Sequence, residues 1–584
     1  MAPTSSQQTS ERATDLPFAA GLLEPASVQR LAEAHANALP YNYCAIKELL
    51  EPSFARDARK DIVEQLAYRA KETDIYKINQ SGDLENISGL PAEELALLPN
   101  LHRLRDAIYS SEFRNFVREV TGCGPLSGVK SDMACNLYEE GCYLLTHDDV
   151  IGTRRISFIL YLPCEEPQWQ PEWGGALELY PIAPADPANP DRPNIPAAKP
   201  TASIPPAFNQ FAFFAVTPGY SFHSVEEVVV EGDGQKGGVG TRVSLQGWFH
   251  SPVEGEEGYE GPEAPIAQST LEQLYAMTLS HRIGYLSAPT LPLPLTPMDP
   301  SSLPLLNPAY FDTSSLAHLR KQFIDNSHLL LSSFLNPNIA SEIETLIRAV
   351  ELSANVTRRF VSIGGHLTNK IPHHWAGEDP ENGWSIVGPP HIQRFLSFAP
   401  KTSATGRLEV LLTEILAMFD SDNFRTWLTN LTAVVPLAHA SQVRRFRPGL
   451  DYTLAKGEPQ DGDAILDVGL GLTPIPANEA DKSLWEDGDV GGWEMWLVGE
   501  EGGDEATYGS GVRKTGEESD DEGTLLALEP AWNTLSLVLR DPGVLKFVKY
   551  VAGKAPGSRW DVSGEWEVGQ VELEEDSEEE KMEE

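Results

Sequence analysis

Apolar residues recur at intervals of three and four positions in the first part of the chain, over residues 25–39, 56–72 and 90–122. This period gathers them on one face of a helix, so these ranges are predicted to be helical. From residue 133 the pattern changes to short runs rich in β-branched and aromatic residues, which predict strands. The predicted strands lie within 133–149, 154–162, 174–181, 209–216 and 241–250. We therefore expect an α+β fold, with helices packed beside a many-stranded antiparallel sheet.

The length of the chain and its turn-rich middle predict two domains. With 584 residues the chain exceeds what a single core normally supports. Residues 251–320 are rich in Pro, Gly and Glu and predict a linker, in which Ser269 and Glu272 form the capping box of one helix. The two domains are then expected over 16–250 and 321–571. Three polar segments are expected to be unstructured: a tail at 1–15, an acidic loop at 499–523 and an acidic tail at 572–584.

The second half repeats features of the first half in the same order. For example, "YEEGCYLLTHDD" at 138–149 has the counterpart "FRPGLDYTLAKG" at 446–457. A common order with a nearly constant offset predicts an internal duplication. Six residue pairs keep offsets between 308 and 324, namely Leu23/Leu335, Gly141/Gly449, Gly175/Gly492, Asn209/Asn533, Gly219/Gly543 and Arg242/Arg559.

The chain is strongly acidic, with a formal net charge of -42 from 86 acidic and 44 basic residues. This charge repels phosphate backbones and anionic membrane surfaces, so we expect no direct nucleic-acid or membrane partner. The five cysteines are odd in number and form no CxxC pair, which is typical of reduced thiols. No apolar run approaches the ~20 residues of a membrane span. We therefore expect an intracellular protein of the nucleus and cytoplasm.

A histidine and an aspartate stand directly before an apolar strand. In "THDDVIGTRRISFILYL", His147 and Asp149 are two residues apart, so on an extended strand they project from the same face while Asp148 points away. Two such side chains on one face form the start of a metal site. HxD alone is a weak signal, because the same spacing is common in ordinary surface segments.

A third candidate ligand follows a later apolar strand. His223 comes after "FNQFAFFAVTPGYSF", and no histidine separates it from His147. Taken alone, a lone histidine is more often an ordinary core or surface residue. With His147 and Asp149 it completes a 2-His-1-carboxylate triad, which holds Fe(II) on one face and leaves positions open for substrate and oxygen. A closed zinc site would need a fourth protein ligand, and the sequence supplies none nearby.

An arginine follows on the next predicted strand, "TRVSLQGWFH". Arg242 shares a strand face with Ser244 and Gln246, and its planar fork can pair with a carboxylate through two hydrogen bonds. A surface arginine on an edge strand is the alternative. Beside the triad, the pattern favours an anchor for a dicarboxylate cosubstrate.

These motifs together resemble a known family. The text "YEEGCYLLTHDDVIGTRRISFILYL…WGGALELY…NQFAFFAVTPGYSFHSVEEV…RVSLQGWFH" is similar to eukaryotic prolyl 3,4-dihydroxylases among the 2-oxoglutarate- and Fe(II)-dependent oxygenases. The resemblance covers nearly the whole chain. It implies two tandem double-stranded β-helix (jelly-roll) domains, the second without metal. The implied activity is hydroxylation of a proline in the decoding-centre protein of the small ribosomal subunit.

The resemblance also implies roles for individual residues. His147, Asp149 and His223 would bind iron, Arg242 would hold the distal carboxylate of 2-oxoglutarate, and Tyr138 would donate a hydrogen bond to the same molecule. The implied cofactors are Fe(II), 2-oxoglutarate and O₂, with ascorbate as a further candidate. An insertion, "EGDGQKGGVG", lengthens the path from His223 to Arg242 and predicts a loop.

The predicted duplication offers an internal comparison of the two halves. In the paired text, Ala455, Gly457 and Phe547 stand where the first half has His147, Asp149 and His223. The second domain is therefore expected to lack the metal site, although Arg559 stands opposite Arg242.

Three alternative functions stay open at this point. A lysyl or histone demethylase shares HxD and the distal histidine but commonly anchors its cosubstrate differently. A nucleic-acid demethylase needs a basic groove, which the composition disfavours. From another class, the chain could act as an oxygen-responsive scaffold whose second domain and acidic segments bind translation or transcription regulators.

Overall fold

The structure is a computed structural model. It describes residues 16–185, 187, 192–261, 282–287, 295–353, 360–363, 366–369, 377–401, 406–457, 462–498, 507–508 and 523–569. The predicted capped helix at Ser269, the tails at 1–15 and 572–584 and nearly all of the acidic loop at 499–523 lie outside the described residues.

The N-terminal half, residues 16–261, contains an antiparallel sheet of strands in the order β1-β9-β6-β11-β4-β3-β5-β10-β7-β8. β2 pairs with β3 and with β22, a short strand from the second half of the chain. The sheet curls on itself. One contact across it is the hydrogen bond from Arg242 Nε of β11 to the carbonyl of Gly175, which lies just before β7. The strands are β1 Tyr43–Ile46, β2 Arg69–Thr73, β3 Tyr76–Gln80, β4 Ser131–Tyr138, β5 Tyr143–His147, β6 Arg154–Tyr161, β7 Leu177–Leu179, β8 Ala202–Ile204, β9 Gln210–Ala215, β10 His223–Val225, β11 Arg242–His250 and β22 Thr507–Tyr508.

The C-terminal half, residues 282–569, contains a second antiparallel sheet in the order β13-β24-β20-β26-β18-β17-β16, with β12 and β19 at its sides. A three-stranded sheet, β23-β21-β25, faces it, since Trp496 of β21 donates to Asp467 of β20. The strands are β12 Ile283–Gly284, β13 His328–Ser332, β14 Phe360–Ile363, β15 His366–Asn369, β16 Trp384–Val387, β17 Gln393–Phe398, β18 Val435–Phe446, β19 Tyr452–Thr453, β20 Ile465–Leu472, β21 Glu494–Val498, β23 Thr524–Leu528, β24 Trp532–Arg540, β25 Val544–Val548 and β26 Arg559–Gly569.

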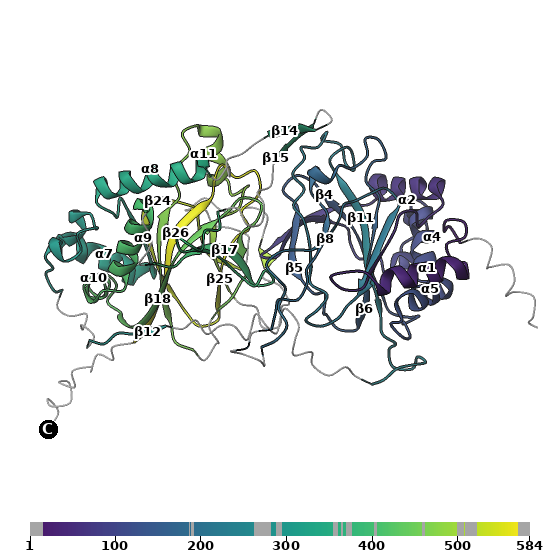
Figure 1. Cartoon of the computed structure of the whole chain (residues 1–584), viewed down its shortest axis with the longest axis horizontal. Helices are drawn as coiled ribbons and strands as arrows, with labels where there is room; N and C mark the ends of the chain where they lie inside the picture. Colours follow the sequence, from purple (N-terminus) through teal and green to yellow (C-terminus); the bar gives the residue numbers. More distant parts are fainter. Residues whose placement is uncertain are drawn as a thin grey trace, which may run out of the picture.

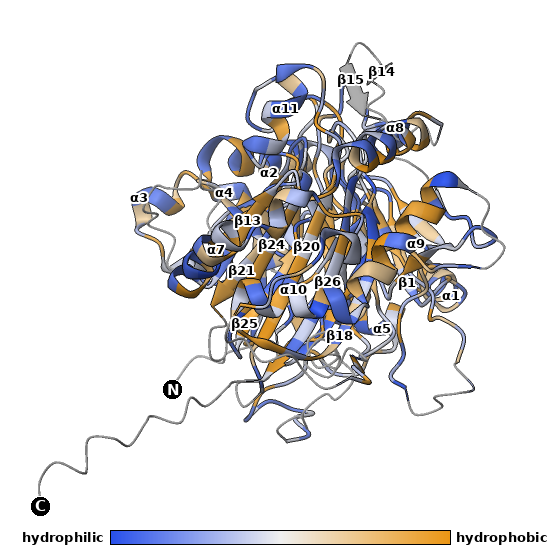
Figure 2. Ribbon diagram, turned by 90° about the vertical axis from the view of Figure 1, so that its left-hand side faces the viewer, coloured by the Kyte–Doolittle hydropathy of each residue, from blue (hydrophilic) through white to orange (hydrophobic). Residues whose placement is uncertain are grey.

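Helices cover the outer flank of each sheet, so that the two sheets lie side by side in the middle of the molecule (Figure 1). Figure 2 looks onto the C-terminal half and shows helices lying across its apolar strands. The expected α+β fold class is therefore confirmed. The helices are α1 Pro25–Ala36, α2 Pro52–Gln65, α3 Ala92–Leu95, α4 Pro99–Ile108, α5 Ser111–Thr121, α7 Thr313–Asn326, α8 Pro337–Ser353, α9 Arg407–Phe419, α10 Asp422–Thr432 and α11 Glu479–Glu486, with 3₁₀ turns at η1 Ile87–Gly89, η2 Pro171–Trp173, η3 Pro300–Ser302 and η4 Pro308–Phe311.

Helix α5 illustrates why these sequences fold as they do. The Ser110 hydroxyl accepts a hydrogen bond from the Phe113 amide and caps the first turn. Four apolar residues at helical spacing are buried against the sheet, and Gly122 ends the helix with a φ of 71°. Helix α10 is built in the same way, since Ser421 caps it through the Phe424 amide.

One predicted helix ends earlier than expected. The range 56–72 was predicted to be helical throughout, but α2 ends at Gln65 and Leu66 is extended, with a ψ of 141°. The residues that follow form strand β2, where Arg69 pairs with Gln80 of β3. The helix prediction for the end of this range is wrong because hairpin pairing, which is not local, outweighs a helical period over a few residues.

Contacts in the two halves match at five of the six predicted residue pairs. Gly141 and Gly449 both have positive φ and donate to the carbonyls of Val228 and Val551 at 2.8 Å. Arg242 donates to the Gly175 carbonyl, and Arg559 donates likewise to Gly492. Asn209 and Asn533 both have positive φ, as do Gly219 and Gly543.

The sixth pair, Leu23/Leu335, is wrong. The Leu335 amide donates to Asn533 Oδ1 at 2.7 Å, and the residue that donates to Asn209 Oδ1 is Leu50, at 3.0 Å. The structural counterpart of Leu335 is therefore Leu50, and that of α8 is α2. The sequence suggested Leu23 because "LLEP" occurs before both α1 and α2.

The two halves contact each other through buried polar groups. Glu227 Oε2 accepts hydrogen bonds from the Gly553 amide at 2.7 Å and the Tyr550 hydroxyl at 3.1 Å. Burial raises the pKa of Glu227 to about 7. Lys549 and Glu72 form a buried ion pair of 2.7 Å. Separating the halves would leave each charge of the pair without its partner, which is costly for a buried group. These contacts therefore favour one arrangement of the two halves.

Two further expectations concern membranes and thiols. None of the helices in the described ranges is long and apolar enough to cross a membrane. All five cysteines are free thiols, as their odd number and spacing predicted, and three of them are buried.

We predict that Asn209 stabilises the N-terminal half in two separable ways. Its side chain bonds both the amide and the carbonyl of Leu50, at a backbone φ of 62°. Asn209→Gly loses the two hydrogen bonds but tolerates this φ, so the free energy of unfolding should fall by about 2 kcal/mol. Asn209→Ala adds backbone strain of about 1 kcal/mol. Urea unfolding of both variants measures whether Asn209→Ala is less stable than Asn209→Gly. Equal free energies of unfolding would contradict the predicted backbone strain at this position.

Candidate metal centre

The two candidate histidines lie directly opposite each other on neighbouring strands. β5 ends at His147 and β10 begins at His223, and the two residues are Cα partners in this antiparallel pair. Their ring centroids are 4.2 Å apart. Within the part of the chain that the structure describes, His147, Asp149 and His223 are the single group of metal-ligating side chains that meet, with candidate ligand atoms within 4.8 Å of one another.

Both imidazoles turn the same nitrogen toward Asp149. His147 Nε2 lies 3.2 Å from Asp149 Oδ1, and His223 Nε2 lies 3.4 Å from Asp149 Oδ2. Each Nδ1 donates to a backbone carbonyl at 2.8 Å, that of Leu145 for His147 and that of Ser221 for His223. Because a carbonyl can only accept, Nδ1 carries the hydrogen and Nε2 is available to a metal, which is the usual support of ligating histidines.

The route by which Asp149 reaches the histidines differs from the prediction. We expected His147 and Asp149 on one face of an extended strand, but β5 ends at His147 and Asp149 has a φ of 60°. This left-handed conformation, which Asp tolerates better than most residues, turns the carboxylate back toward the strand end. A strained backbone at a cluster of polar side chains is typical of a functional site.

Asp148 points away from the cluster, as predicted, and has a structural role. Its Oδ2 accepts a hydrogen bond from the Gly219 amide at 3.3 Å, and its carbonyl accepts one from the Ser221 hydroxyl at 3.0 Å. Asp148 therefore ties the β5 end to the turn that precedes His223.

The three side chains influence one another's charge. Burial raises the pKa of Asp149, but His223 and His147 lower it by more, so the net pKa lies well below its ordinary value. Burial lowers the pKa of His147, whereas the hydrogen bond and charge of Asp149 raise it and prevail. An ionised carboxylate between two imidazoles is the donor set that a divalent cation requires.

Arg242 lies further inside the curled sheet with one nitrogen uncommitted. The residue is 1% exposed; Nε donates to the Gly175 carbonyl at 2.8 Å and Nη1 to the Ser244 hydroxyl at 3.1 Å. Nη2 is buried and, among the described residues, has no hydrogen-bond partner. A buried guanidinium nitrogen without a partner is costly, so its position fits an anionic ligand.

Tyr138 lies beside this arginine, as the sequence predicted. Tyr138 and Arg242 are Cα partners on β4 and β11, and the guanidinium carbon lies 4.6 Å from the centre of the tyrosine ring. Burial raises the pKa of Tyr138, so its hydroxyl stays a neutral donor. The structure thus places all five predicted residues around one interior space, while their roles as ligands stay predictions.

Sequence reasoning missed two polar residues in the same interior. Asn136 is fully buried, and both polar atoms of its side chain have no partner in the described ranges. The Tyr161 hydroxyl is likewise buried, and the guanidinium carbon of Arg242 lies 4.9 Å from the centre of the Tyr161 ring. Both residues are Cα partners of Ser244, which lies two residues after Arg242 on the same strand face. This position on the neighbouring strands is the signal that could have identified them.

A third missed residue, Trp248, contacts the candidate metal ligands directly. Its indole Nε1 donates to Asp149 Oδ2 at 3.0 Å, and Arg154 stacks 3.5 Å above its ring. Trp248 thus orients the carboxylate that completes the triad. Its position at an even spacing from Arg242 on β11 is the sequence signal for a side chain on the same face.

The C-terminal half carries different side chains at the matching positions. Leu179 pairs with His223 in the first sheet, and Trp496 pairs with Lys546 in the second. The backbone of Lys546 in turn forms an antiparallel β-bridge with that of Lys456. The expected counterparts Ala455 and Phe547 are therefore wrong by one residue: they pack together on the opposite face of the strands.

Two imidazoles, one carboxylate and a buried arginine with a free nitrogen define a class of site, that of the 2-oxoglutarate- and Fe(II)-dependent oxygenases. The comparisons agree with this class. The profile described as "2OG-Fe(II) oxygenase superfamily" matches residues 133–250. A second profile, described as "Oxoglutarate and iron-dependent oxygenase degradation C-term", matches residues 303–576.

Named relatives narrow the assignment further. Prolyl 3,4-dihydroxylase OGFOD1 of Ostreococcus tauri is 35% identical over 537 residues, which cover 90% of this chain and 95% of that protein. Prolyl 3-hydroxylase OGFOD1 of Mus musculus is 24% identical over 555 residues, covering 88% of this chain and 84% of that protein. A Pseudomonas putida prolyl-4-hydroxylase structure covers 38% of this chain and 98% of its own at 19% identity and a TM-score of 0.23. The chain belongs to the family of OGFOD1 prolyl hydroxylases, and this membership implies Fe(II) as the cofactor and 2-oxoglutarate and O₂ as cosubstrates.

We predict that Arg242 sets the affinity for 2-oxoglutarate without affecting iron. Arg242→Met removes the guanidinium that Gly175 and Ser244 orient. Truncating one partner of a buried charge pair costs about 3 kcal/mol, or roughly a hundredfold in dissociation constant. Calorimetric titration with 2-oxoglutarate under anaerobic conditions measures the loss. Arg242→Lys, which keeps the charge but not the fork, should lie between the two, and unchanged affinity in Arg242→Met would refute the anchor role.

We predict that Trp248→Phe weakens Fe(II) binding while it leaves the fold intact. The variant keeps an aromatic ring under Arg154 and loses the hydrogen bond to Asp149. Residues that support a metal ligand are typically worth roughly tenfold to a hundredfold in metal affinity. Competition with a chelator measures this change. Trp532→Phe, in the other half, is the matched control and should bind Fe(II) as the unaltered protein does.

Proposed function

We propose that this protein hydroxylates a prolyl residue of the decoding-centre protein of the small ribosomal subunit, and so affects translation. The observation that carries the proposal is the meeting of His147, Asp149 and His223 at one point, with the free nitrogen of Arg242 deeper in the same interior. Relatives named as prolyl hydroxylases support the reaction. The ribosomal substrate comes from the resemblance in sequence.

The residues of the chain take distinct parts in this reaction. His147, Asp149 and His223 would hold Fe(II), which supplies oxygen activation coupled to the oxidative decarboxylation of 2-oxoglutarate. Arg242 and Tyr138 would bind the distal carboxylate, and Asn136 and Tyr161 offer further buried hydrogen-bonding groups around it. The buried interior excludes water from the reacting atoms. Ascorbate is retained as a further candidate cofactor.

The hydroxylated position is proposed to be C3, with C4 as a second position. Relatives of both kinds are known, one named prolyl 3,4-dihydroxylase and another named prolyl 3-hydroxylase. The higher identity, 35% against 24%, favours the dihydroxylase.

A basic ribosomal protein suits the charge of this chain. A net charge of -42 attracts a basic partner over several ångströms and raises its association rate. The same charge disfavours direct contact with nucleic acid or anionic lipid. We propose that the enzyme acts in the nucleus and cytoplasm, where newly made ribosomal proteins are found.

We further propose that the chain consists of two tandem jelly-roll domains, of which the second is a metal-free copy. The matching contacts at Gly141/Gly449, Asn209/Asn533 and Arg242/Arg559 support the duplication. The catalytic domain would span 16–250, with 251–320 as the connection and 321–571 as the second domain. The end of the connection also packs into the second core, since Leu303, Leu306 and Phe311 are buried there.

A second candidate function is an oxygen-responsive scaffold. The profile that matches residues 303–576 is described by a role in degradation, which favours a regulatory partner for the second half. In this case translation or transcription regulators would bind the second domain, and the oxygenase site would control that binding or act on another protein.

The test is a reaction of the full-length protein with Fe(II), 2-oxoglutarate and small-subunit ribosomal proteins. Mass spectrometry should detect one or two oxygen atoms added to a single proline, together with succinate. His147→Ala should abolish both products, whereas Lys321→Met, an exposed control, should not change them. Succinate formation with another protein but with no ribosomal protein would sink the substrate assignment and leave the enzyme class intact.

A further inference from the structure

The C-terminal half encloses a cavity at the place that matches the metal centre of the N-terminal half. Its volume is about 240 Å³. Three cationic side chains, Arg444, Lys456 and Lys546, line it together with the carboxylates of Glu494 and Glu565. The rest of the wall contains uncharged polar residues, namely Gln393, Ser441, Gln442, Thr453 and Ser563, and the apolar or glycine residues Phe395, Ala440, Phe547, Val548 and Gly564. Nothing in the proposed prolyl hydroxylation uses this cavity.

Two lysines occupy the strand positions of the two metal-binding histidines. Lys456 and Lys546 are bridge partners and exchange backbone hydrogen bonds of 3.2 and 2.7 Å, as His147 and His223 are partners in the first sheet. Like charges directly opposite each other on neighbouring strands repel. A positive charge therefore stands where the first half would hold a metal cation, and it needs a counter-charge.

A connected chain of ion pairs surrounds the cavity and accounts for every carboxylate in it. Lys546 lies 3.2 Å from Asp467 and 3.5 Å from Glu494. The remaining pairs join Arg444, Arg559, Arg540 and Arg282 to Glu494, Asp561, Asp467 and Glu565. These pairs join five cations and four carboxylates of the described residues.

Lys456 is a further cation of the wall and takes no part in these ion pairs. It lines the same cavity, yet no ion pair or hydrogen bond of its ammonium group is found among the residues with described positions. The two lysines also differ in pKa. Burial lowers the pKa of Lys456, whereas Asp467 and Glu494 outweigh burial and raise the pKa of Lys546. Lys456 therefore adds to the cavity wall a positive charge that is in no ion pair within the described part of the chain, although Glu565 acts on it from further away.

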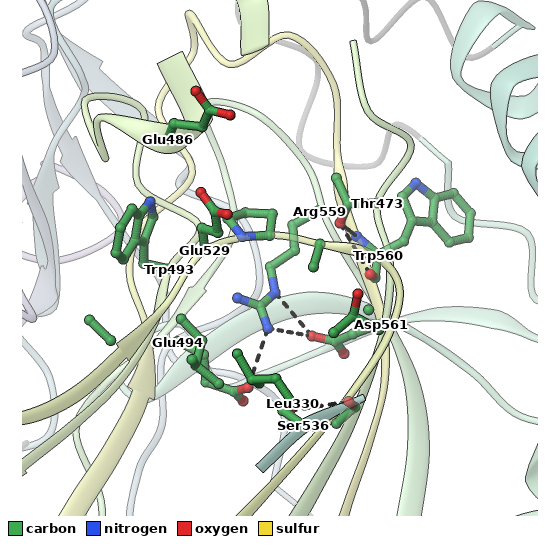
Figure 3. Close-up of a pocket in the computed structure, with 17 residues that line it drawn as sticks. Leu330, Thr473, Glu486, Trp493, Glu494, Glu529, Ser536, Arg559, Trp560 and Asp561 are labelled. Carbon is green, nitrogen blue, oxygen red and sulfur yellow. Dashed lines mark hydrogen bonds and ion pairs between the residues drawn. The ribbon is translucent and has the colours of Figure 1, made fainter. Parts of the chain in front are cut away.

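The larger neighbouring cavity does not offer the same opportunity. Its volume is about 510 Å³, and Arg559, the counterpart of Arg242, lies on its wall. Figure 3 shows the Arg559 guanidinium held between Glu494 and Asp561. The ion pairs measure 3.4 and 2.8 Å, so this arginine is already neutralised and cannot anchor a dicarboxylate as Arg242 could.

We propose that the cavity at Lys456 and Lys546 is a binding site for a small dianion, a phosphate-type or dicarboxylate ligand held by the two ammonium groups in place of a metal ion. Charge-assisted hydrogen bonds from ammonium groups and hydroxyls are the usual means of holding such anions. Ser441, Ser563 and Thr453 supply hydroxyls in the same wall. The volume of about 240 Å³ admits an anion of this size.

The test titrates inorganic phosphate and, separately, succinate into the full chain after removal of metal with EDTA. The succinate arm uses Arg242→Met, because the N-terminal site would otherwise bind a dicarboxylate. Calorimetry should show one saturable site for at least one of the two anions. Lys456→Met should weaken it roughly tenfold to a hundredfold, the loss of one charge-assisted hydrogen bond. Phosphate alone would identify a phosphate-type ligand, and succinate would identify a dicarboxylate.

Two control variants separate binding from folding. Lys456→Arg keeps the charge and should retain binding, and Lys321→Met, which changes an exposed lysine, should bind as the unaltered chain does. Without added anion, Lys456→Met should melt no lower than the unaltered chain, because Lys456 is in no ion pair within the described part of the chain. The proposal is overturned if neither anion binds, or if Lys456→Met binds the anion as tightly as the unaltered chain.

Discussion

The pairing of β5 with β10 is the constraint on which the site depends. It sets His147 opposite His223, although the two are 76 positions apart in the chain. The other residues of the centre are arranged around this pair. Asp149 turns back toward both imidazoles, and Trp248 orients its carboxylate. Asp148 holds the turn that precedes His223. A shift of one residue in this register would turn one histidine to the other face of the sheet.

The second half pairs strands in a similar way around different side chains. Lysines replace the histidines, and a chain of buried ion pairs fills the interior around them. Within the described ranges, Arg242 Nη2 and the side chain of Asn136 have no hydrogen-bond partner, whereas in the second half Arg444 and Arg559 are paired with Asp561 and Glu494. One interior is prepared for a ligand that completes it, and the other is largely neutralised by its own side chains.

The strands that carry the candidate metal ligands also contact the other half of the chain. Tyr143 of β5 packs against Tyr550 at 4.3 Å between ring centres, and Glu227, two residues beyond β10, bonds to Tyr550 and Gly553. The C-terminal half therefore supports the strands that carry His147 and His223. This contact gives a physical reason for the second half to be retained even where it performs no chemistry.

By itself, the sequence predicted the longer strands of the first half and their antiparallel class, and it singled out five candidate site residues, because these depend on local period and on residue types with few alternative uses. Only the tertiary structure decided the end of α2, the left-handed turn at Asp149 and the true counterparts of Leu335 and His223. Each of these depends on which strand lies beside which, and in what register. Asn136, Tyr161 and Trp248 joined the site for the same reason, since their polar atoms acquire meaning only through neighbours distant in the chain.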